Sequence, residues 1–167
     1  MKKKDMAELA PEEKAYRLLK KNGLTVTTAE SLTGGLVAAR LVNVAGVSEV
    51  FKEGFVTYSD KAKRRTLSVS KGTLKKYTAV SRQTAREMAI GAAFAADADV
   101  SIVTTGIAGP DGGTEKKPVG LVYIGCFMKD LVTVEEHIFD GDRAAVREQA
   151  VDAALKLLVS TIEKNVK

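Results

Sequence analysis

Two β-strand patterns that each end in a glycine-rich segment constrain the fold of this chain most strongly. The first, "LTVTTAE" at 24–30, precedes "SLTGG", and the second, "DVSIVTTG" at 99–106, precedes "IAGPDGG". β-Branched residues favour extended backbone, and the near-continuous apolar run of the second pattern is typical of a strand with both faces buried. Glycine pairs predict tight turns, so each pattern indicates a strand followed by a loop.

Helical and β patterns alternate along the rest of the chain. Further strands are expected at 51–59, 119–129 and 131–140, the last two as a hairpin that turns at Lys129-Asp130. Periodicity and capping residues predict helices at 11–22, 36–46, 60–67, 73–77, 81–96 and 141–164. We therefore expect an α/β fold with a mixed, mostly parallel sheet, helices on both faces and a C-terminal antiparallel hairpin.

Small side chains mark one face of the helix expected at 81–96, where Ser81 is the predicted cap. Ala85, Met88, Ala89 and Ala92 recur on this face and would let the helix lie close to a sheet. The same small residues could instead serve self-association, although packing on the sheet is the simpler use.

Length and composition indicate one domain. The chain has 167 residues, of which 45% are hydrophobic, enough to fill a single sizeable core. It contains no run of about eighteen apolar residues, and its N-terminal lysines precede no apolar signal segment, so we expect a cytoplasmic protein without a membrane span. Cys126, the only cysteine, excludes an internal disulfide and is expected as a buried strand thiol.

The net charge of +5 raises the hypothesis of nucleic-acid binding through "KKK" at 2–4 and "KAKRR" at 61–65. Aromatic residues make up only 5% of the chain, and none is interleaved with these clusters for base stacking. Anionic small molecules are therefore at least as plausible as partners.

The carboxyl ends of neighbouring strands are where an open α/β sheet binds its ligands, and both glycine-rich segments belong there. Backbone at these glycines could approach a ligand closely and bind an anion or an oxyanion, or each glycine could simply make a turn. The sequence leaves both interpretations open. The glycines concerned are Gly34, Gly35, Gly106, Gly109, Gly112 and Gly113. Neither segment has the lysine of a P-loop or the spacing of a dinucleotide fingerprint, which disfavours nucleoside triphosphate chemistry.

The only histidine, His137, stands alone in a strand pattern and belongs to no metal-ligand spacing, so no metal and no cofactor are expected. A Ser-His-Asp triad is improbable for the same reason. If Ser31 is a nucleophile, a lysine with a lowered pKa could accept its proton, and Lys63 is the candidate. Nearby Lys61 and Arg64 would disfavour its charged form, and Tyr58 could orient it or relay a proton. The alternative is that Lys63 is an ordinary solvated surface lysine.

Five segments together resemble the CinA C-terminal domain family over nearly the whole chain. They are "TVTTAESLTGGLVAARL", "GFVTYSDKAK", "AVS", "GIAGPDGGTEKKPVGLVYIG" and "GDRAAVREQA". The resemblance implies a three-layer α/β/α sandwich and a single stand-alone domain over 1–167. It further implies hydrolysis of nicotinamide mononucleotide to nicotinate mononucleotide and ammonia in pyridine nucleotide recycling, without a metal, by a homo-oligomer.

The resemblance also assigns roles to particular residues. Ser31 matches the family's nucleophile and Lys63 its general base, with Tyr58 nearby, and Thr105 matches a hydroxyl position before "GIAGP". The proposed mechanism is acyl transfer to Ser31 followed by hydrolysis, with Lys63 serving both half-reactions.

Further residues are expected to contact the substrate. The backbone N–H groups of Thr33, Gly34 and Gly35 would form an oxyanion hole at the helix start, and Gly106 and Gly109 would approach the ligand. Glu30 would hold Lys63 or the loop, although a carboxylate beside Lys63 would raise the pKa of a base that must be neutral. Arg143 and Arg147 are candidates for the phosphate, or they make ordinary surface pairs.

Two other classes of function stay open. A non-catalytic nucleotide-binding or competence-related interaction module would keep the glycine loops but lose Ser31 or Lys63, and here both are present. Nucleic-acid binding is the third and least favoured interpretation. It predicts an affinity that falls steeply with salt and does not change when Ser31 is replaced.

Overall fold

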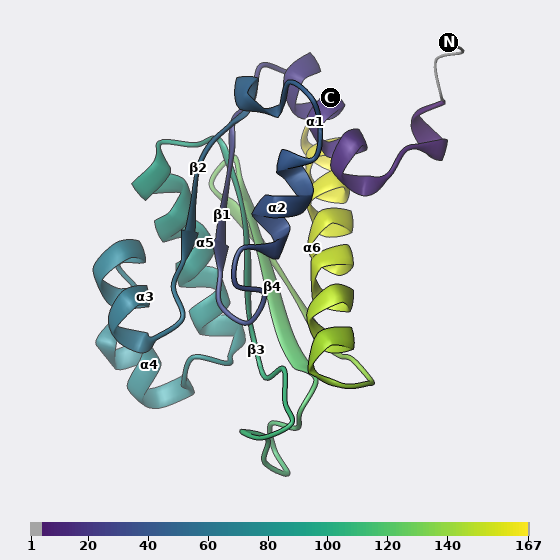
Figure 1. The fold of residues 1–167 in the computed structure, drawn as a ribbon. Helices are drawn as coiled ribbons and strands as arrows, with labels where there is room; N and C mark the ends of the chain where they lie inside the picture. The colour runs from purple at the N-terminus through teal and green to yellow at the C-terminus, as the bar shows by residue number, and fades with distance from the viewer. Residues whose placement is uncertain (1–4, 167) are drawn as a thin grey trace.

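A five-stranded mixed sheet lies between two layers of helices in the computed structural model, which describes residues 5–166 (Figure 1). The strand order is β2-β1-β3-β4-β5. Strand β1 pairs in parallel with β2 and β3, whereas β3, β4 and β5 are antiparallel neighbours. The strands are β1 Val26–Glu30, β2 Phe51–Val56, β3 Val100–Gly106, β4 Leu121–Met128 and β5 Leu131–Ile138. The predicted sandwich with a C-terminal antiparallel hairpin is confirmed. The lysines at 2–4 lie outside the described residues.

Helices cover both faces of the sheet. One face carries α1 Pro11–Lys21, α2 Leu36–Val42 and α6 Arg143–Asn165, and the other carries α3 Asp60–Leu67, α4 Lys71–Tyr77 and α5 Arg82–Ala96 (Figure 1). Two short 3₁₀ turns, η1 Met6–Glu8 and η2 Val47–Glu49, complete the described elements. Each face therefore has its own apolar core, and the central strands β1 and β3 are buried between them.

Local sequence signals account for several of these boundaries. The Ser59 hydroxyl accepts the N–H of Ala62 at the start of α3, and the Ser81 hydroxyl accepts the N–H of Thr84 at the start of α5. Lys129 and Asp130 both have positive φ, of 51° and 62°, which suits the tight turn of a hairpin whose strands twist. The predicted Ser81 cap and the predicted turn position are thus confirmed.

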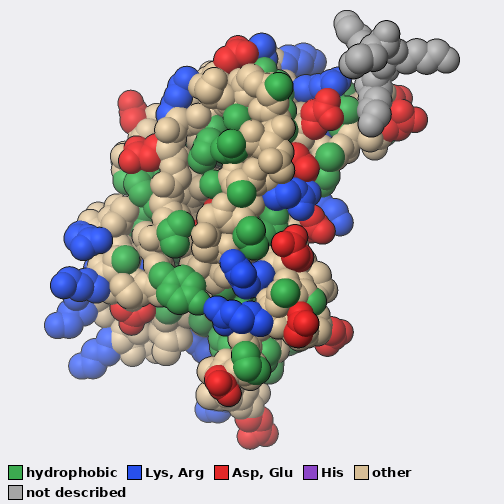
Figure 2. Space-filling model, viewed as in Figure 1, with side chains coloured by type: hydrophobic (Ala, Val, Ile, Leu, Met, Phe, Trp, Pro, Cys, Tyr) green, Lys and Arg blue, Asp and Glu red, His purple; other side chains and the backbone are tan. Residues whose placement is uncertain are grey.

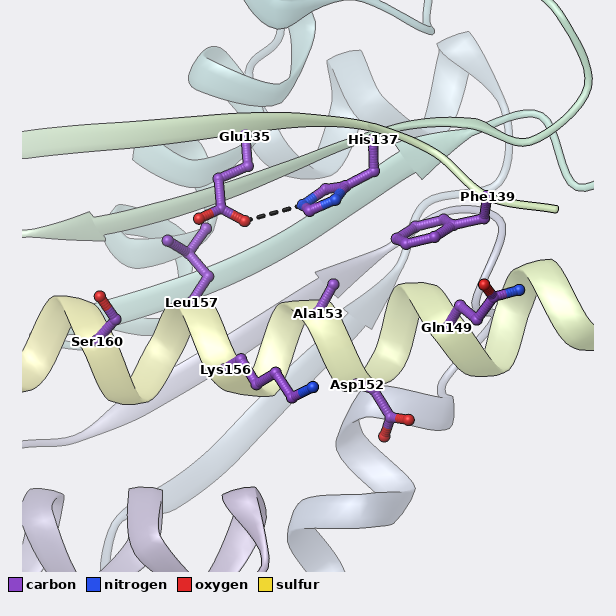
Figure 3. A pocket seen from close by; sticks show the side chains of 9 residues that line it. All are labelled: Glu135, His137, Phe139, Gln149, Asp152, Ala153, Lys156, Leu157 and Ser160. Atoms are coloured by element: carbon purple, nitrogen blue, oxygen red, sulfur yellow. Dashed lines mark hydrogen bonds and ion pairs between the residues drawn. The ribbon is translucent and has the colours of Figure 1, made fainter. Parts of the chain in front are cut away.

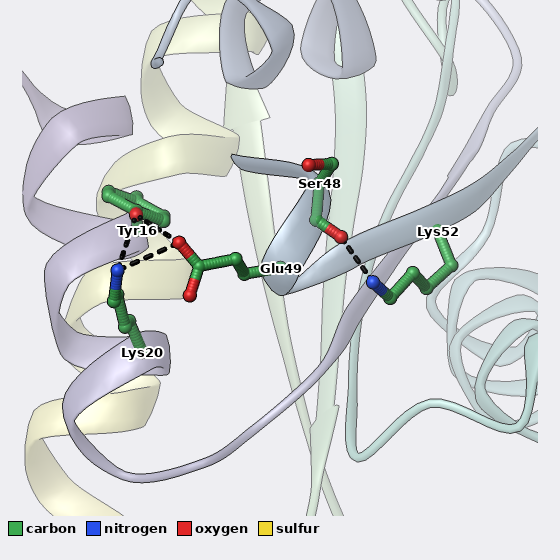
Figure 4. A network of polar contacts seen from close by, with 5 residues as sticks. All are labelled: Tyr16, Lys20, Ser48, Glu49 and Lys52. Carbon is green, nitrogen blue, oxygen red and sulfur yellow. Dashed lines mark hydrogen bonds and ion pairs between the residues drawn. The ribbon is translucent and has the colours of Figure 1, made fainter. Parts of the chain in front are cut away.

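A polar network joins the helical layer to the start of β2 (Figure 4). The Glu49 carboxylate in η2 accepts hydrogen bonds from Lys20 Nζ at 2.7 Å and from the Tyr16 hydroxyl at 3.3 Å, both on α1. Lys52, the second residue of β2, donates to the Ser48 carbonyl. Because the Lys20–Glu49 pair is half exposed, it orients the turn more than it stabilises the fold.

Cys126 lies fully buried on β4, as predicted. Burial raises the pKa of its thiol to about 12, so the thiol stays protonated and unreactive at neutral pH. Within residues 5–166, no helix has the length and apolar character that crossing a membrane requires.

Helix α5 packs closely against both the sheet and α3. Ala85, Met88, Ala89 and Ala92 are fully buried, which confirms the predicted small-residue face. Gly91 lies on another side of this helix, where a Cβ atom would be only 1.8 Å from the Leu67 carbonyl oxygen at the end of α3. The contact of α5 with α3 therefore depends on the absence of a side chain at position 91.

We predict that Gly91→Ala lowers the free energy of unfolding by about 1–3 kcal/mol, because the added methyl group must displace rigid backbone. The matched control is Gly72→Ala on α4, where the nearest atom to a new Cβ is the Ser70 hydroxyl at 3.4 Å. Alanine there favours the helix and should be neutral or raise stability by up to about 1 kcal/mol. Urea unfolding followed by circular dichroism measures both, and equal midpoints for the two variants would contradict the close approach.

Candidate active site

The carboxyl ends of β1 and β3 carry the residues that the sequence singled out. Ser31 follows β1 directly, and its N–H donates to the Thr104 carbonyl of β3, so the hydrogen-bonded ladder continues to this residue. The Ser31 side chain is nearly buried, with 9% of the residue exposed. Its hydroxyl is thereby held on a rigid strand end.

Lys63, on α3, extends its side chain to Ser31. Helix α3 turns its inner face to the core with Lys63 and Leu67, four residues apart, and both are only 1% exposed. Lys63 Nζ lies 3.1 Å from Ser31 Oγ and donates a hydrogen bond of 2.8 Å to the Thr57 carbonyl. Lys63 is therefore a buried lysine paired with the serine, and the interpretation as a solvated surface residue is wrong.

Burial lowers the pKa of the Lys63 amine, and the charge of Asp60 offsets only part of that effect. The expected cause was different, because Lys61 and Arg64 were predicted to disfavour the charged form. Both of those side chains are exposed, where water screens their charge. The direction of the shift matches the prediction, but desolvation is its main cause.

Glu30 holds the loop and is not hydrogen-bonded to Lys63. Its carboxylate, 1% exposed, accepts hydrogen bonds from the N–H groups of Val37 at 2.8 Å and Ala38 at 3.1 Å. It also accepts one from the Thr33 hydroxyl at 2.6 Å. A carboxylate at this position satisfies the free N–H groups of α2 and suits the positive end of its dipole. Of the two roles expected for Glu30, the geometry favours support of the loop.

Residues 33–35 form the turn between Ser31 and α2. Gly34 and Gly35 have φ values of 57° and 105°, which a residue with a side chain rarely adopts. The N–H of Gly34 donates to the Ser31 carbonyl and is therefore already engaged. Arg147 of α6 donates to the carbonyls of Leu32 at 2.9 Å and Thr33 at 3.3 Å, which ties the turn to α6.

A cavity of about 290 Å³ opens beside the Ser31–Lys63 pair. Seven of the twelve predicted site residues line it, namely Ser31, Tyr58, Lys63, Thr105, Gly106, Gly109 and Arg143. The other five, Glu30, Thr33, Gly34, Gly35 and Arg147, lie in or against the supporting turn and do not belong to the lining. Ala79, Val80 and Asp111 also line the cavity and were not predicted from the sequence. They lie in "AVS" and "GPDGG", parts of the segments that resemble the family, and this resemblance could have indicated them.

Arg143 bridges two rims of the cavity. Its guanidinium donates to the Gly109 carbonyl at 2.8 Å and to the Tyr58 hydroxyl at 2.9 Å. Tyr58 is 62% exposed and has no hydrogen bond to Lys63, so the lysine is oriented by the Thr57 carbonyl and not, as expected, by Tyr58. Arg143 is accordingly a cavity residue rather than an ordinary surface arginine paired with a neighbouring carboxylate.

The glycines at the end of β3 and in the loop that follows it lie close to other protein atoms and not beside open space. A Cβ atom at Gly106 would lie 2.7 Å from the Leu121 carbonyl oxygen, and one at Gly109 would lie 2.5 Å from a methyl group of Val119. At Gly113 the nearest atom would be the Val119 nitrogen, at 2.7 Å. Packing of the loop against itself thus explains these three glycines, in line with the turn interpretation.

A second, larger cavity of about 490 Å³ lies between β5 and α6 (Figure 3). His137 is half-buried there, with its Nε2 at 2.9 Å from a Glu135 carboxylate oxygen and its ring stacked on Phe139. This cavity contains no buried nucleophile beside a base. Across residues 5–166, no group of three or more histidine, cysteine or carboxylate side chains is arranged to hold a metal ion.

The basic cluster "KAKRR" divides between the interior and the surface. Lys63 points inward, while Lys61, Arg64 and Arg65 line a shallow exposed groove with Lys71. Figure 2 shows lysine and arginine side chains gathered over the α3–α4 corner of the molecule. The periodicity of one short helix thus separates the candidate base from the surface charges.

The fold and the site together define an α/β domain that holds a buried serine–lysine pair at the carboxyl ends of parallel strands. A family model described as the CinA C-terminal domain matches residues 8–162. A curated relative from Clostridium beijerinckii, whose name describes a competence-damage inducible protein, is 56% identical over 147 residues. The match covers 88% of this chain and 36% of the relative, so the chain spans about a third of the length of that protein.

Solved structures agree with this assignment. A competence-damaged protein (CinA) superfamily protein from Klebsiella pneumoniae is 35% identical with a TM-score of 0.89, covering 96% of this chain and 99% of the other. A CinA superfamily protein from Escherichia coli is 38% identical with a TM-score of 0.88, covering 96% and 94%. The chain belongs to the CinA C-terminal domain family.

We predict that Glu30→Ala lowers the free energy of unfolding by about 3 kcal/mol, because two backbone N–H groups and the Thr33 hydroxyl lose a buried acceptor. Glu53→Ala, on exposed β2, is the control and should change stability by less than about 0.5 kcal/mol. Urea denaturation gives both values. A Glu30→Ala variant as stable as the control would show that the carboxylate does not hold the turn.

Proposed function

We propose that this domain hydrolyses the carboxamide of nicotinamide mononucleotide, giving nicotinate mononucleotide and ammonia, with Ser31 as nucleophile and Lys63 as general base. The observation that carries the proposal is the 3.1 Å separation of the Lys63 amine and the Ser31 hydroxyl at the wall of a cavity. A buried lysine without a bonded carboxylate is suited to be neutral, which a base requires.

In the first half-reaction, the neutral Lys63 amine takes the hydroxyl proton while Ser31 Oγ bonds to the amide carbon. The Thr57 carbonyl accepts one N–H of the amine, which turns the amine lone pair toward Ser31. When the carbon–nitrogen bond breaks, the Lys63 ammonium donates its proton to the leaving nitrogen and ammonia departs. The result is an acyl-enzyme and a lysine that is neutral again.

In the second half-reaction, water attacks the acyl carbon and Lys63 accepts the water proton. The ester bond to Ser31 breaks, and the proton passes from Lys63 to the serine oxygen, which regenerates both groups. One base thus serves both steps, and the mechanism assigns no role to a metal ion. We assign no oxyanion donor to the turn at 33–35, because the Gly34 N–H is engaged within the turn and neither Thr33 nor Gly35 lines the cavity.

Substrate contacts follow from the lining of the cavity. We assign the phosphate to Arg143, the one arginine among the lining residues, since a guanidinium matches phosphate geometry. Tyr58 presents an exposed ring at the rim, and Gly106 and Gly109 present backbone. Arg147 is bonded to the turn that carries Ser31, so we give it a supporting role.

A non-catalytic nucleotide-binding or competence-related module is the second candidate, favoured by the competence-damage inducible name of the relatives. Such a module has no need of a lysine desolvated against a serine. Burying that amine costs stability, so its presence favours the enzyme.

The test is ammonia release from nicotinamide mononucleotide by purified, chelator-treated protein. Wild-type protein should turn over, while Ser31→Ala and Lys63→Met should lose at least about a thousandfold in kcat, since each removes one member of the acid–base pair. Lys61→Met, which changes an exposed lysine on the same helix, should keep wild-type activity.

Circular dichroism verifies that every variant is folded. Turnover by the wild type and Lys61→Met alone supports the Ser31–Lys63 pair. If the nucleotide binds and neither the wild type nor any variant releases ammonia, the binding-module candidate replaces the enzyme.

The pH dependence of kcat/KM follows from the lowered pKa of Lys63. Because the neutral amine is the active form, we predict that kcat/KM rises with pH through the lowered pKa and levels off above it. The rise should lie clearly below 10.5, the ordinary value for a lysine. A rise centred near 10.5, or no rise with pH anywhere between acidic and alkaline pH, would exclude Lys63 as the base.

A further inference from the structure

The connection between α4 and α5 is held by side chains at every carbonyl from Tyr77 to Val80. Lys117 Nζ donates to the carbonyls of Tyr77 and Val80, both at 2.7 Å. The hydroxyls of Ser81 and Thr84 donate to the Thr78 carbonyl, at 3.1 Å and 2.7 Å, and the Thr105 hydroxyl donates to the Ala79 carbonyl at 2.7 Å. We call residues 77–80 the α4–α5 strap.

Thr78 sits at the centre of this strap in strained backbone. Its φ of 68° and ψ of 175° fall in a region that glycine alone adopts readily, and a β-branched side chain makes the conformation worse. Such a conformation persists only where surrounding contacts hold it. The strap is therefore kept in a shape that its own sequence opposes.

Lys117 supplies the largest share of those contacts. Besides the carbonyls of Tyr77 and Val80, its ammonium donates to the Thr78 hydroxyl at 2.8 Å. An ammonium group has three N–H donors, and all three are used on the strap. The side chain comes from the long loop between β3 and β4, and Tyr77 lies 40 residues before it in the sequence.

Both connected loops form walls of the cavity that contains Ser31 and Lys63. Ala79 and Val80 line it from the strap, and residues 107–109 with 111–112 line it from the loop of Lys117. Both loops lie toward the end of the sheet where β1 and β3 finish (Figure 1). Lys117 itself is absent from the lining. Its bonds therefore set the distance between two walls without occupying the space between them.

We propose that Lys117 is a positioning residue, which clamps the strap to the β3–β4 loop and so holds the amide substrate against Ser31. This inference rests on the proposed amidase function. The clamp acts on the walls and not on the Ser31–Lys63 pair, so its loss should weaken substrate binding while the nucleophile keeps its reactivity.

The test compares Lys117→Met, which keeps the aliphatic stem and removes the three donors, with Lys116→Met at the exposed neighbouring lysine. We expect Lys117→Met to raise KM for nicotinamide mononucleotide about tenfold and to lower kcat/KM about 10- to 100-fold. Labelling of Ser31 by a small fluorophosphonate should stay within about twofold of wild type. Lys116→Met should match the wild type in all three measurements.

Amide hydrogen exchange reports on the clamp without any turnover. The peptide spanning 74–84 should exchange faster in Lys117→Met and unchanged in Lys116→Met. A purely structural role would lower the active fraction and hence the apparent kcat, but it would leave KM unchanged. Unchanged KM, unchanged exchange, or a loss of labelling equal to the loss of turnover would each overturn the proposal.

Thr78→Gly provides a second variant in case Lys117→Met folds poorly. Glycine adopts the conformation at position 78 without strain, so the double variant Thr78→Gly/Lys117→Met should recover melting temperature and still show the raised KM. Recovery of both quantities would assign Lys117 to stability alone and overturn the positioning role. If the wild type releases no ammonia, the proposed function fails. The exchange experiment then still shows whether Lys117 holds the strap. Comparing the labelling of Ser31 by small and by bulky fluorophosphonates shows whether the loss of Lys117 changes the cavity.

Discussion

The buried carboxylate of Glu30 is the interaction on which the rest of the site depends. It lies at the end of β1 and accepts the N–H groups of Val37 and Ala38 in the first turn of α2, so strand, turn and helix meet at one charged group. Ser31 follows immediately, and Arg147 fixes the outer carbonyls of the same turn from α6. Because both ends of the turn are satisfied, the serine hydroxyl has a defined direction toward α3.

Lys63 turns this scaffold into a candidate catalyst at a cost in stability. The amine of a lysine residue that is 1% exposed, with a serine hydroxyl and a carbonyl beside it, loses most of its hydration. The lowered pKa expresses that loss, and the same loss makes the neutral amine accessible. Lys61 and Arg64 on the same short helix are exposed, so a single turn of α3 separates the buried amine of Lys63 from ordinary surface charge.

The cavity walls are loops, and side-chain hydrogen bonds replace regular secondary structure in holding them. Arg143 connects Tyr58 to the β3–β4 loop, and Thr105 connects β3 to Ala79. Lys117 connects the β3–β4 loop to the strained α4–α5 strap. Strain of the kind seen at Thr78 typically costs about 1–3 kcal/mol, so several bonds must act together to maintain it. Loops fixed in this way can be as well defined as the strands that carry Ser31 and Thr105.

The sequence by itself determined the order of strands and helices along the chain, the Ser81 cap, the hairpin turn and the candidates Ser31 and Lys63, because each depends on local pattern or on resemblance. Only the tertiary structure decided that Lys63 is buried against Ser31, that Glu30 points into α2 and that Thr57 rather than Tyr58 orients the lysine. It likewise decided that Lys117 reaches the strap. Those outcomes depend on which way a side chain points once distant segments pack together, and desolvation and partner choice exist only after that packing.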